Sequence, residues 1–292
     1  MLQKHKEPYI QQIRDDRLKD VQLFVKREDV IHPFISGNKW HKLKYNLSEA
    51  QKQGYDTLLT FGGAYSNHIY ATAAAAREAG FSSIGIIRGD ELKGQPLNRT
   101  LTFAREQGMR LEFVDRTAYR NKTDEVFVQR LHERFGPFYL IPEGGTNNLA
   151  ISGCAEMVND EVRTFDYICC SAGTGGTVSG LIAGMNSAGY VIGFAALKGD
   201  FLEKEVRKLL TGHSNAQLTN WEIQTRYHFG GYAKSHEQLK RFMQDFEQRH
   251  QALLDPVYTG KMMYGVFDLI AEKYFPSGSK VLAIHTGGLQ GR

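Results

Sequence analysis

The chain has 292 residues, of which 41% are hydrophobic and 23% charged, and its formal net charge is +4. These are the values of an ordinary globular protein with a large core and about two domains. The basic residues are spread along the chain rather than gathered in one run, which argues against nucleic-acid or membrane-surface partners.

Targeting and redox signals are sparse. The first residues lack the apolar stretch of a signal peptide, and no apolar run reaches the length of a membrane span. The three cysteines, Cys154, Cys169 and Cys170, are odd in number and lack C-x-x-C spacing. This pattern favours reduced, buried thiols and offers no zinc site. We therefore expect a cytoplasmic protein without a metal.

Strand-like and helix-like segments alternate along the chain. The expected strands are 55–61, 83–88, 110–114, 138–141, 167–170, 190–197 and 280–284. The expected helices include 68–80, 96–108 and 178–188, with two late helices around 235–246 and 263–270. Pro96 is expected at the start of its helix, and Ser235 with Gln238 has capping-box spacing. The alternation predicts an α/β protein with mostly parallel sheets, whose ligands bind at the carboxyl ends of strands.

Lys39 opens a segment in helical register, with Trp40, Leu43 and Leu47 on one face. An amine at a helix start has a lowered proton affinity, which suits a Schiff base with an aldehyde cofactor. Taken alone, the segment favours a solvated surface lysine. Two later glycine-rich segments change this interpretation and favour a Schiff-base lysine.

The first of these segments, Gly173-Thr174-Gly175-Gly176-Thr177, lies between an expected strand and an expected helix. Its backbone N–H groups can converge on an anion, and the helix N-terminus adds its dipole. Neither a nucleotide P-loop nor a dinucleotide fingerprint is present. We predict a single-phosphate site here; a purely structural strand-to-helix turn is the alternative.

The second segment places Ser66, Asn67 and His68 where a helix begins after a strand. These residues either cap that helix or bind a carboxylate. Farther along, Tyr258 precedes another helix, and Tyr232 follows a Gly-Gly pair. A buried tyrosine near cations can act as an acid or base, although most tyrosines only pack.

Six motifs in order carry a family resemblance. They are K-R-E-D at 26–29, S-G-N-K at 36–39, G-G-A-Y-S-N-H at 62–68, G-T-G-G-T at 173–177, D-P-V-Y-T-G-K at 255–261 and H-T-G-G at 285–288. Together they resemble the fold-type II pyridoxal-phosphate enzymes, the tryptophan synthase β-like group. Within that group they are similar to the branch of 1-aminocyclopropane-1-carboxylate (ACC) deaminase and D-cysteine desulfhydrase.

The resemblance implies a two-domain fold in which each domain is a mostly parallel twisted sheet flanked by helices. Residues 1–46 and 156–292 would form the large cofactor-binding domain, and 47–155 the small substrate-side domain. Pyridoxal 5'-phosphate would lie in the cleft between them. The resemblance also implies a small amino acid as substrate and a homodimer.

The resemblance assigns roles to individual residues. Lys39 would form the Schiff base with the cofactor and move protons. The predicted catalytic residues are Lys39, Ser66, Tyr232 and Tyr258. The predicted cofactor-binding residues are Lys39, Asn67 at the 3′-oxygen, Gly173, Thr174, Gly175, Gly176 and Thr177 at the phosphate, and Thr286 at the pyridine nitrogen. The predicted substrate-binding residues are Ser66, Asn67, His68, Tyr258 and Thr259.

Two positions bear on the reaction. Thr259 and Thr286 stand where ACC deaminases carry glutamate and leucine. A threonine hydroxyl cannot maintain a protonated pyridinium as a carboxylate can, and expelling a thiolate is less demanding than opening a cyclopropane ring. The sequence favours D-cysteine desulfhydrase-like β-elimination to pyruvate, ammonia and sulfide. ACC deamination to 2-oxobutyrate and ammonia is the alternative.

Further alternatives are a racemase or deaminase for another small amino acid, and a cofactor-binding carrier or regulator without turnover. A nicotinamide-dependent oxidoreductase fails on the missing fingerprint. Glu143 and Cys154 depart from the family pattern, which has a small residue and a tyrosine at these places.

Overall fold

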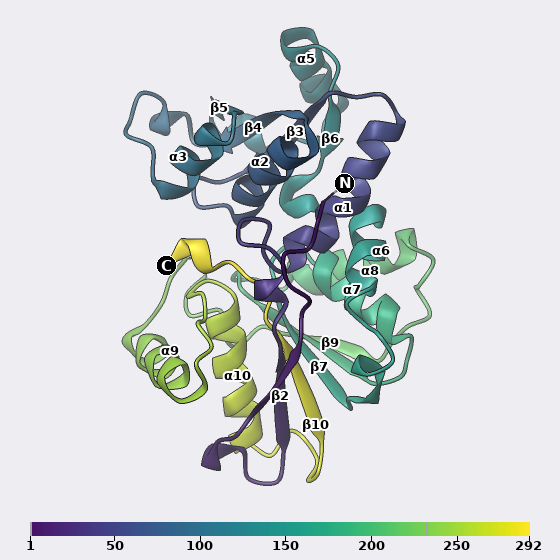
Figure 1. Ribbon diagram of the computed structural model, residues 1–292, viewed down its shortest axis with the longest axis vertical. Coiled ribbons are helices and arrows are strands. Elements are labelled where there is room, and N and C mark those ends of the chain that lie inside the picture. The colour runs from purple at the N-terminus through teal and green to yellow at the C-terminus, as the bar shows by residue number, and fades with distance from the viewer. Residues whose placement is uncertain (1, 232) are drawn as a thin grey trace. The chain divides into compact units, whose positions relative to one another are not determined.

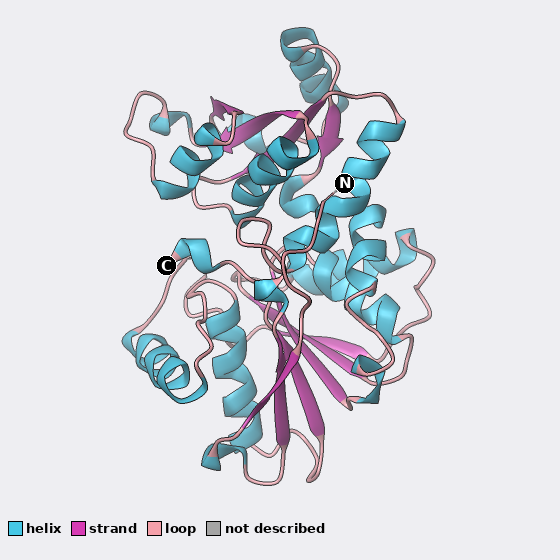
Figure 2. Cartoon of the chain, in the orientation of Figure 1, coloured by secondary structure: helices cyan, strands magenta, loops and turns pink. Residues whose placement is uncertain are grey.

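A computed structural model describes residues 2–231 and 233–292. The chain divides into two compact units (Figures 1 and 2). Unit 1 comprises residues 2–3 and 43–146, and unit 2 comprises 4–42 and 147–292. The domain boundaries expected from the sequence, after 46 and after 155, stay a prediction. In the structure, α6 (Asn148–Ala155) packs against α7 (Gly176–Met185) within unit 2.

The described part of unit 2 contains a six-stranded sheet with the order β1-β2-β10-β7-β8-β9. Its strands are β1 (Ile10–Ile13), β2 (Gln22–Lys26), β7 (Tyr167–Ala172), β8 (Tyr190–Ala195), β9 (Trp221–Gln224) and β10 (Lys280–Ile284). The β1–β2 pair is antiparallel, and every other pair is parallel. The predicted α/β class with mostly parallel sheets is confirmed here.

The two faces of this sheet are both buried, as parallel strands require. Val281 and Ala283 of β10 face one core, and Leu282 and Ile284 face the other, because side chains alternate along a strand. The first core is covered by α9 (Glu237–His250) and α10 (Thr259–Ala271), and the second by α6, α7 and α8 (Phe201–Gly212). Figure 1 shows these helix groups on opposite sides of the strands.

Unit 1 is built on a four-stranded, all-parallel sheet with the order β5-β4-β3-β6. Its strands are β3 (Thr57–Gly62), β4 (Ser82–Arg88), β5 (Met109–Val114) and β6 (Tyr139–Ile141). One face packs against α2 (Asn67–Ala79) and α3 (Arg99–Glu106), and the other against α4 (Arg116–Arg120) and α5 (Glu125–Phe135). Most of α1 (Asn38–Lys52) is counted in unit 1, but its first turn belongs to unit 2.

Several sequence-based element boundaries are confirmed and others are wrong. Gly80 ends α2 in the left-handed conformation, as predicted. Pro96 lies ahead of α3, whose N-cap is Asn98, so it does not open the helix. The capping box is also wrong: α9 begins after His236 without a side-chain cap, and Gln238 bonds the Tyr264 hydroxyl at 2.5 Å.

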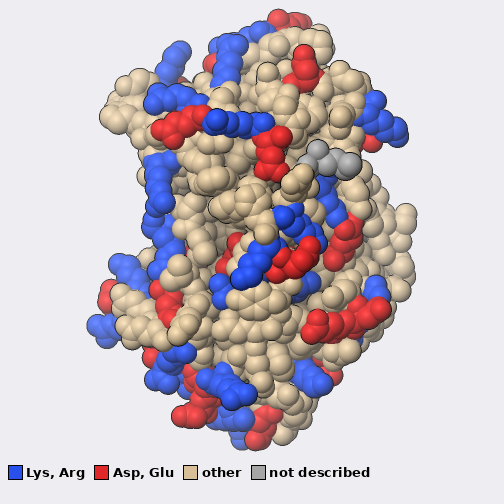
Figure 3. All heavy atoms as spheres, in the orientation of Figure 1, with Lys and Arg blue, Asp and Glu red and all other residues tan. Residues whose placement is uncertain are grey.

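The surface and the thiols agree with the composition. Lysine and arginine side chains are interspersed with acidic ones over the face drawn in Figure 3. The three cysteines are buried and free. Within residues 2–231 and 233–292, no helix has both the length and the apolar character needed to cross a bilayer. The same residues contain no cluster of His, Cys, Asp and Glu suited to a metal.

Candidate functional site

Lys39 is held by two interlocked turns in unit 2. Gly37 has φ +59°, and a Cβ on it would lie 2.1 Å from the Thr286 carbonyl oxygen. Conversely, Gly287 has φ +78°, and its Cβ would lie 2.4 Å from Ser36 Oγ. Only glycine fits either position, because both the backbone angle and the close approach exclude a side chain. The S-G-N-K motif and the H-T-G-G motif therefore pack directly against each other, and this packing fixes the turn that leads into Lys39.

The amine of Lys39 has an unusual proton affinity. Its side chain is only partly exposed. Two causes lower the pKa of Lys39 to about 7: burial, which is the larger, and the positive charge of the nearby Lys42 ammonium. Lys42 itself is 2% exposed, and burial lowers its pKa as well. At neutral pH a large fraction of Lys39 is therefore the uncharged, nucleophilic amine.

The glycine loop lies next to this lysine pair. Asn38 Nδ2 donates a hydrogen bond to Thr177 Oγ1 at 2.8 Å, which joins the first turn of α1 to that of α7. Cys154 in α6 is fully buried; it interacts with Thr177 and experiences the charges of Lys39 and Lys42. Burial raises the pKa of Cys154 to about 11, so its thiol stays protonated.

Two further predicted residues border the loop. The ring of Tyr258 lies 3.3 Å from where a Cβ on Gly173 would be, so the absence of a side chain there lets the ring approach the loop. Thr286 follows β10, and its hydroxyl oxygen lies 3.0 Å from that of Ser171, near the end of β7. Both hydroxyls are buried. Unit 2 thus brings Lys39, the Gly173–Thr177 loop, Tyr258 and Thr286 into one connected region.

The side chains of the K-R-E-D motif support this region through ion pairs and hydrogen bonds. Glu28 is 1% exposed and contacts His41 Nε2 at 2.8 Å and Lys26 Nζ at 3.2 Å. Burial alone would raise the pKa of Glu28, but these two partners outweigh it and lower the pKa. Asp29 holds Arg27 through two bonds of 2.8 Å. The motif therefore links the end of β2 to the first turn of α1.

Thr259 lies in a helix cap. It is fully buried at the start of α10, where its hydroxyl donates to Asp255 Oδ2 at 2.9 Å and accepts from the Asp255 N–H at 2.8 Å. Asp255 also accepts from the backbone N–H groups of Val257, Tyr258 and Thr259. Thr259 thus stabilises the segment that carries Tyr258. Its assignment as a substrate-binding residue stays a prediction.

In unit 1, Ser66 is the N-cap of α2. Its Oγ accepts from the N–H groups of His68 at 3.2 Å and Ile69 at 3.3 Å, and Asn67 begins the helix. The His68 ring is 2% exposed, with Nε2 2.8 Å from Thr60 Oγ1 and Nδ1 3.4 Å from Thr72 Oγ1.

The Thr60 hydroxyl donates its one hydrogen to the Ile141 carbonyl, so His68 Nε2 is the donor to Thr60. The imidazole is therefore part of an internal network that orients the start of α2. Ser66, Asn67 and His68 stay predictions as substrate and cofactor residues.

The two departures from the family pattern have structural explanations. Glu143 accepts a hydrogen bond from the Tyr119 hydroxyl at 2.7 Å and pairs with Lys122 at 3.3 Å, all within unit 1. Cys154 packs directly against Gly180 of α7. A tyrosine at 154 would not fit this close helix contact. Tyr232 lies outside the described residues.

A family model described as "Pyridoxal-phosphate dependent enzyme" matches residues 4–287. The chain belongs to this family of pyridoxal-phosphate dependent enzymes.

Two relatives are named "Putative 1-aminocyclopropane-1-carboxylate deaminase". The Thermotoga maritima protein is 32% identical over 92% of this chain and 89% of its own length. The Pyrococcus horikoshii protein is also 32% identical, over 92% of this chain and 85% of its own.

Solved structures agree in fold. The crystal structure of an ACC deaminase homologue has a TM-score of 0.83 and 29% identity, covering 99% of this chain and 92% of that one. A hydrogen sulfide-producing enzyme from Fusobacterium nucleatum has a TM-score of 0.70 at 14% identity, covering 97% of this chain and 96% of that one, which shows the fold alone.

The residues of unit 2 fit the pyridoxal-phosphate cofactor of this family. Lys39 supplies a partly neutral amine for an aldehyde. The Gly173–Thr177 loop opens α7, whose N-terminal N–H groups suit a phosphate. Lys42 adds a buried positive charge to the same region, which an anionic group would offset. These residues would hold the cofactor.

Sequence reasoning did not identify Lys42 as a buried charge beside Lys39, and it missed Ser171. Lys42 lies three residues after Lys39 and therefore on the same side of α1, a spacing that was available in the sequence. Ser171 carried no such signal, because its partner Thr286 is on a different strand.

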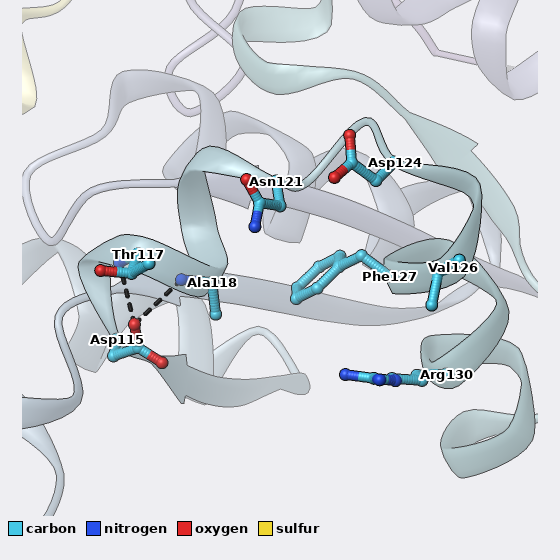
Figure 4. A pocket seen from close by; sticks show the side chains of 8 residues that line it. All are labelled: Asp115, Thr117, Ala118, Asn121, Asp124, Val126, Phe127 and Arg130. Carbon is cyan, nitrogen blue, oxygen red and sulfur yellow. Dashed lines mark hydrogen bonds between the residues drawn. The ribbon is translucent and has the colours of Figure 1, made fainter.

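A groove elsewhere in unit 1 contains none of the predicted site residues. It has a volume of about 350 Å³ between α4 and α5, where the ring of Phe127 projects toward α4 (Figure 4). Asp115 at its edge is already bonded to the N–H groups of Thr117 and Ala118. Arg130, on its other side, is exposed.

Proposed function

We propose that this enzyme deaminates a small amino acid to a 2-oxo acid, with ACC as its first candidate substrate. The observation that carries the proposal is Lys39, a partly neutral amine beside a glycine loop that opens a helix. The two relatives that carry the ACC deaminase name support ACC, at 32% identity over 92% of the chain. They favour it over the D-cysteine reaction that the sequence ranked first.

The cofactor, when bound, supplies an electron sink that weakens the bonds at the substrate Cα. The protein supplies proton transfer and binding. An amine with a pKa near 7 both accepts and returns a proton at neutral pH, so Lys39 Nζ is the group to which we assign that role. Ser66, as N-cap of α2, presents a hydroxyl next to the positive end of a helix dipole, which suits the substrate carboxylate.

D-Cysteine is the second candidate, and a specific observation favours it. Thr286 pairs with the neutral hydroxyl of Ser171, and both hydrogen bonds of the Thr259 hydroxyl are with Asp255. Neither threonine replaces the carboxylate that ring opening of ACC calls for. β-Elimination requires less electron withdrawal, because Lys39 can remove the α-proton and the thiolate leaves readily.

The test presents ACC, D-cysteine and L-cysteine separately to the cofactor-loaded protein and identifies the 2-oxo acid. ACC plus water would give 2-oxobutyrate and ammonia, whereas cysteine plus water would give pyruvate, ammonia and sulfide. 2-Oxobutyrate from ACC supports the first candidate, and pyruvate from D-cysteine alone supports the second. Release of neither acid, with the cofactor bound, contradicts both candidate substrates and favours a carrier, or a racemase or deaminase for another small amino acid.

The matched controls are Lys39→Ala and Lys44→Ala, two lysines of the same helix. Lys39→Ala is expected to abolish both the near-visible band of the bound cofactor and the product. Lys44→Ala is expected to keep both. A band that survives in Lys39→Ala contradicts the assignment of Lys39. The homodimer implied by the resemblance stays a prediction.

A further inference from the structure

Asn38 connects the turn that carries Lys39 to two other motifs of unit 2. It is the first residue of α1 and directly precedes Lys39. Its backbone N–H donates to the Thr286 carbonyl oxygen at 3.4 Å, and its side-chain Nδ2 donates to Thr177 Oγ1 at 2.8 Å. Thr177 lies 139 residues farther along the chain, at the end of the glycine loop. One asparagine therefore joins the lysine to the loop that suits a phosphate.

The bond from Asn38 leaves the hydroxyl hydrogen of Thr177 available to a ligand. A threonine hydroxyl has one hydrogen and two lone pairs, and Asn38 uses one lone pair. In the part of the chain that the structure describes, the one other side-chain partner of this hydroxyl is the Cys154 thiol, a weak acceptor. A phosphate oxygen at the start of α7 is a stronger acceptor. It would take this hydrogen and so hold the side chain to which Asn38 is bonded.

Capture of an aldehyde by Lys39 depends on the position of the same turn. The neutral Nζ attacks the carbonyl carbon, a C=N bond replaces the C=O bond, and the carbonyl oxygen leaves with the two amine hydrogens as water. The attack requires the nitrogen and the carbon to lie about 3–3.5 Å apart, so a small shift of the turn is costly. A group that orders Thr177 therefore also orders the backbone from which Lys39 reacts, through Asn38.

We infer that Asn38 is a positioning residue that couples a phosphate at the Gly173–Thr177 loop to aldehyde capture by Lys39, so that the protein selects aldehydes that carry a phosphate. Asn38 needs no contact with the reacting atoms, because it acts through Thr177 and through its peptide bond to Lys39. The inference concerns loading of the cofactor and is the same whichever amino acid is the substrate.

The first test compares pyridoxal 5'-phosphate with pyridoxal, which has the same aldehyde and no phosphate. Both are titrated into the full-length apoprotein, and the near-visible band reports binding. Asn38→Ala removes the donor without changing any charge, so attraction between a phosphate and the lysines remains. We expect its affinity for pyridoxal phosphate to fall about tenfold and its affinity for pyridoxal to change less than about twofold. Equal losses for the two aldehydes overturn the inference, as does no loss for either.

Asn148→Ala is the matched control for Asn38→Ala. Asn148 is also the first residue of a helix in unit 2, and its Nδ2 donates to the Gly212 carbonyl oxygen at 2.9 Å rather than to the glycine loop. Its affinities for both aldehydes are expected to equal those of the wild type. A selective loss for pyridoxal phosphate in Asn148→Ala would show that any weakened helix start has this effect, and would overturn the role of Asn38.

The second test asks whether the loop and Lys39 communicate when two separate molecules bind. Inorganic phosphate and pyridoxal are titrated together into the apoproteins. Saturating phosphate is expected to tighten pyridoxal binding about fivefold in the wild type and less than about twofold in Asn38→Ala. In a Thr177→Val background, Asn38→Ala should have little further effect, because valine offers no acceptor.

Three outcomes of this titration overturn the inference: no coupling in the wild type, coupling of equal size in Asn38→Ala, or independent, multiplying effects in the double variant. Neither titration uses an amino-acid substrate. If the loaded wild type releases no 2-oxo acid, the proposed function fails, whereas the two titrations still decide the role of Asn38.

Discussion

Ser171 and Thr286 share a buried hydrogen bond between hydroxyl oxygens 3.0 Å apart, at the carboxyl ends of the neighbouring strands β7 and β10. Thr286 also accepts the Asn38 N–H through its carbonyl oxygen at 3.4 Å. One residue therefore connects the central strands of the unit 2 sheet to the turn that carries Lys39. Replacing either hydroxyl tests this connection without any cofactor.

Thr286→Val and Ser171→Ala are each expected to lower the free energy of unfolding by about 1–2 kcal/mol. Each variant removes one of the two hydroxyls and so deprives the other, which stays buried, of this hydrogen bond. The double variant should cost clearly less than the sum, since the second substitution removes a group that has already lost its bond. Urea unfolding of the four apoproteins measures this. Strictly additive losses would show that the two hydroxyls do not interact.

Gly37→Ala is expected to destabilise the fold by about 3 kcal/mol or more, because it combines a positive φ with a clash against the Thr286 carbonyl. It should also weaken cofactor binding, because the displaced turn carries Lys39. Gly54→Ala is the control: Gly54 has φ +77° with open space around its Cβ, so only about 1 kcal/mol of strain is expected. Equal losses in the two variants would contradict the interlock of the two turns. Urea unfolding and cofactor titration measure the two effects.

The apoprotein should capture pyridoxal phosphate at a rate that rises with pH and levels off above about 7. The reason is that the nucleophilic form of Lys39 is the neutral amine, and its pKa is lowered to about 7. An ordinary lysine with the reference value of 10.5 would continue to gain rate far above that pH. Stopped-flow absorbance of the bound cofactor follows the reaction.

Lys42→Met should move this inflection to higher pH, because it removes a positive charge that disfavours protonation of Lys39. An inflection that stays in place would rule out Lys42 as a cause of the shift. Lys44→Met, two residues farther along α1, is the charge-matched control, because Lys44 is not among the groups that shift the pKa of Lys39.

Thr259→Val should lower the free energy of unfolding by about 1–3 kcal/mol, since Asp255 loses a buried hydrogen-bond donor and its own N–H loses an acceptor. Burial already raises the pKa of Asp255, and loss of this donor should raise it further. A buried acid whose pKa is higher in the folded than in the unfolded protein destabilises the fold increasingly as the pH rises. Because Thr259→Val should raise the pKa of Asp255 further, the free energy of unfolding lost through the substitution should be larger at neutral than at acidic pH.

Thr211→Val is the control for Thr259→Val. Thr211 also donates its hydroxyl hydrogen, to the Arg207 carbonyl at 2.9 Å, but at an exposed site. A change within about 0.5 kcal/mol is expected for it. Chemical unfolding at pH 5 and pH 7 provides the comparison, and similar small losses in both variants would contradict the structural role of Thr259.

Much of the architecture was predictable from local pattern. The alternation of strands and helices, the glycine cap of α2 and the loop before α7 depend on neighbours within a few residues. Six motifs in order indicated the family and its cofactor. The strands β1, β2 and β9 were missed: each has only four or five residues, and β1 and β9 also lie at the edges of the sheet, so periodicity is a weak signal for them. Helix starts at α3 and α9 were misplaced because several polar residues compete to cap a helix.

By itself, then, the sequence determined the fold class and the family, because these depend on local periodicity and on residue types in order, and it predicted Lys39 as the Schiff-base lysine. Only the tertiary structure decided what lies against that lysine. Gly37 meets Thr286, Ser171 meets the same threonine, and Lys42 becomes buried, through contacts between segments far apart in the chain. Such contacts depend on how strands and helices pack and on which polar groups lose water, and no short window of sequence contains that information.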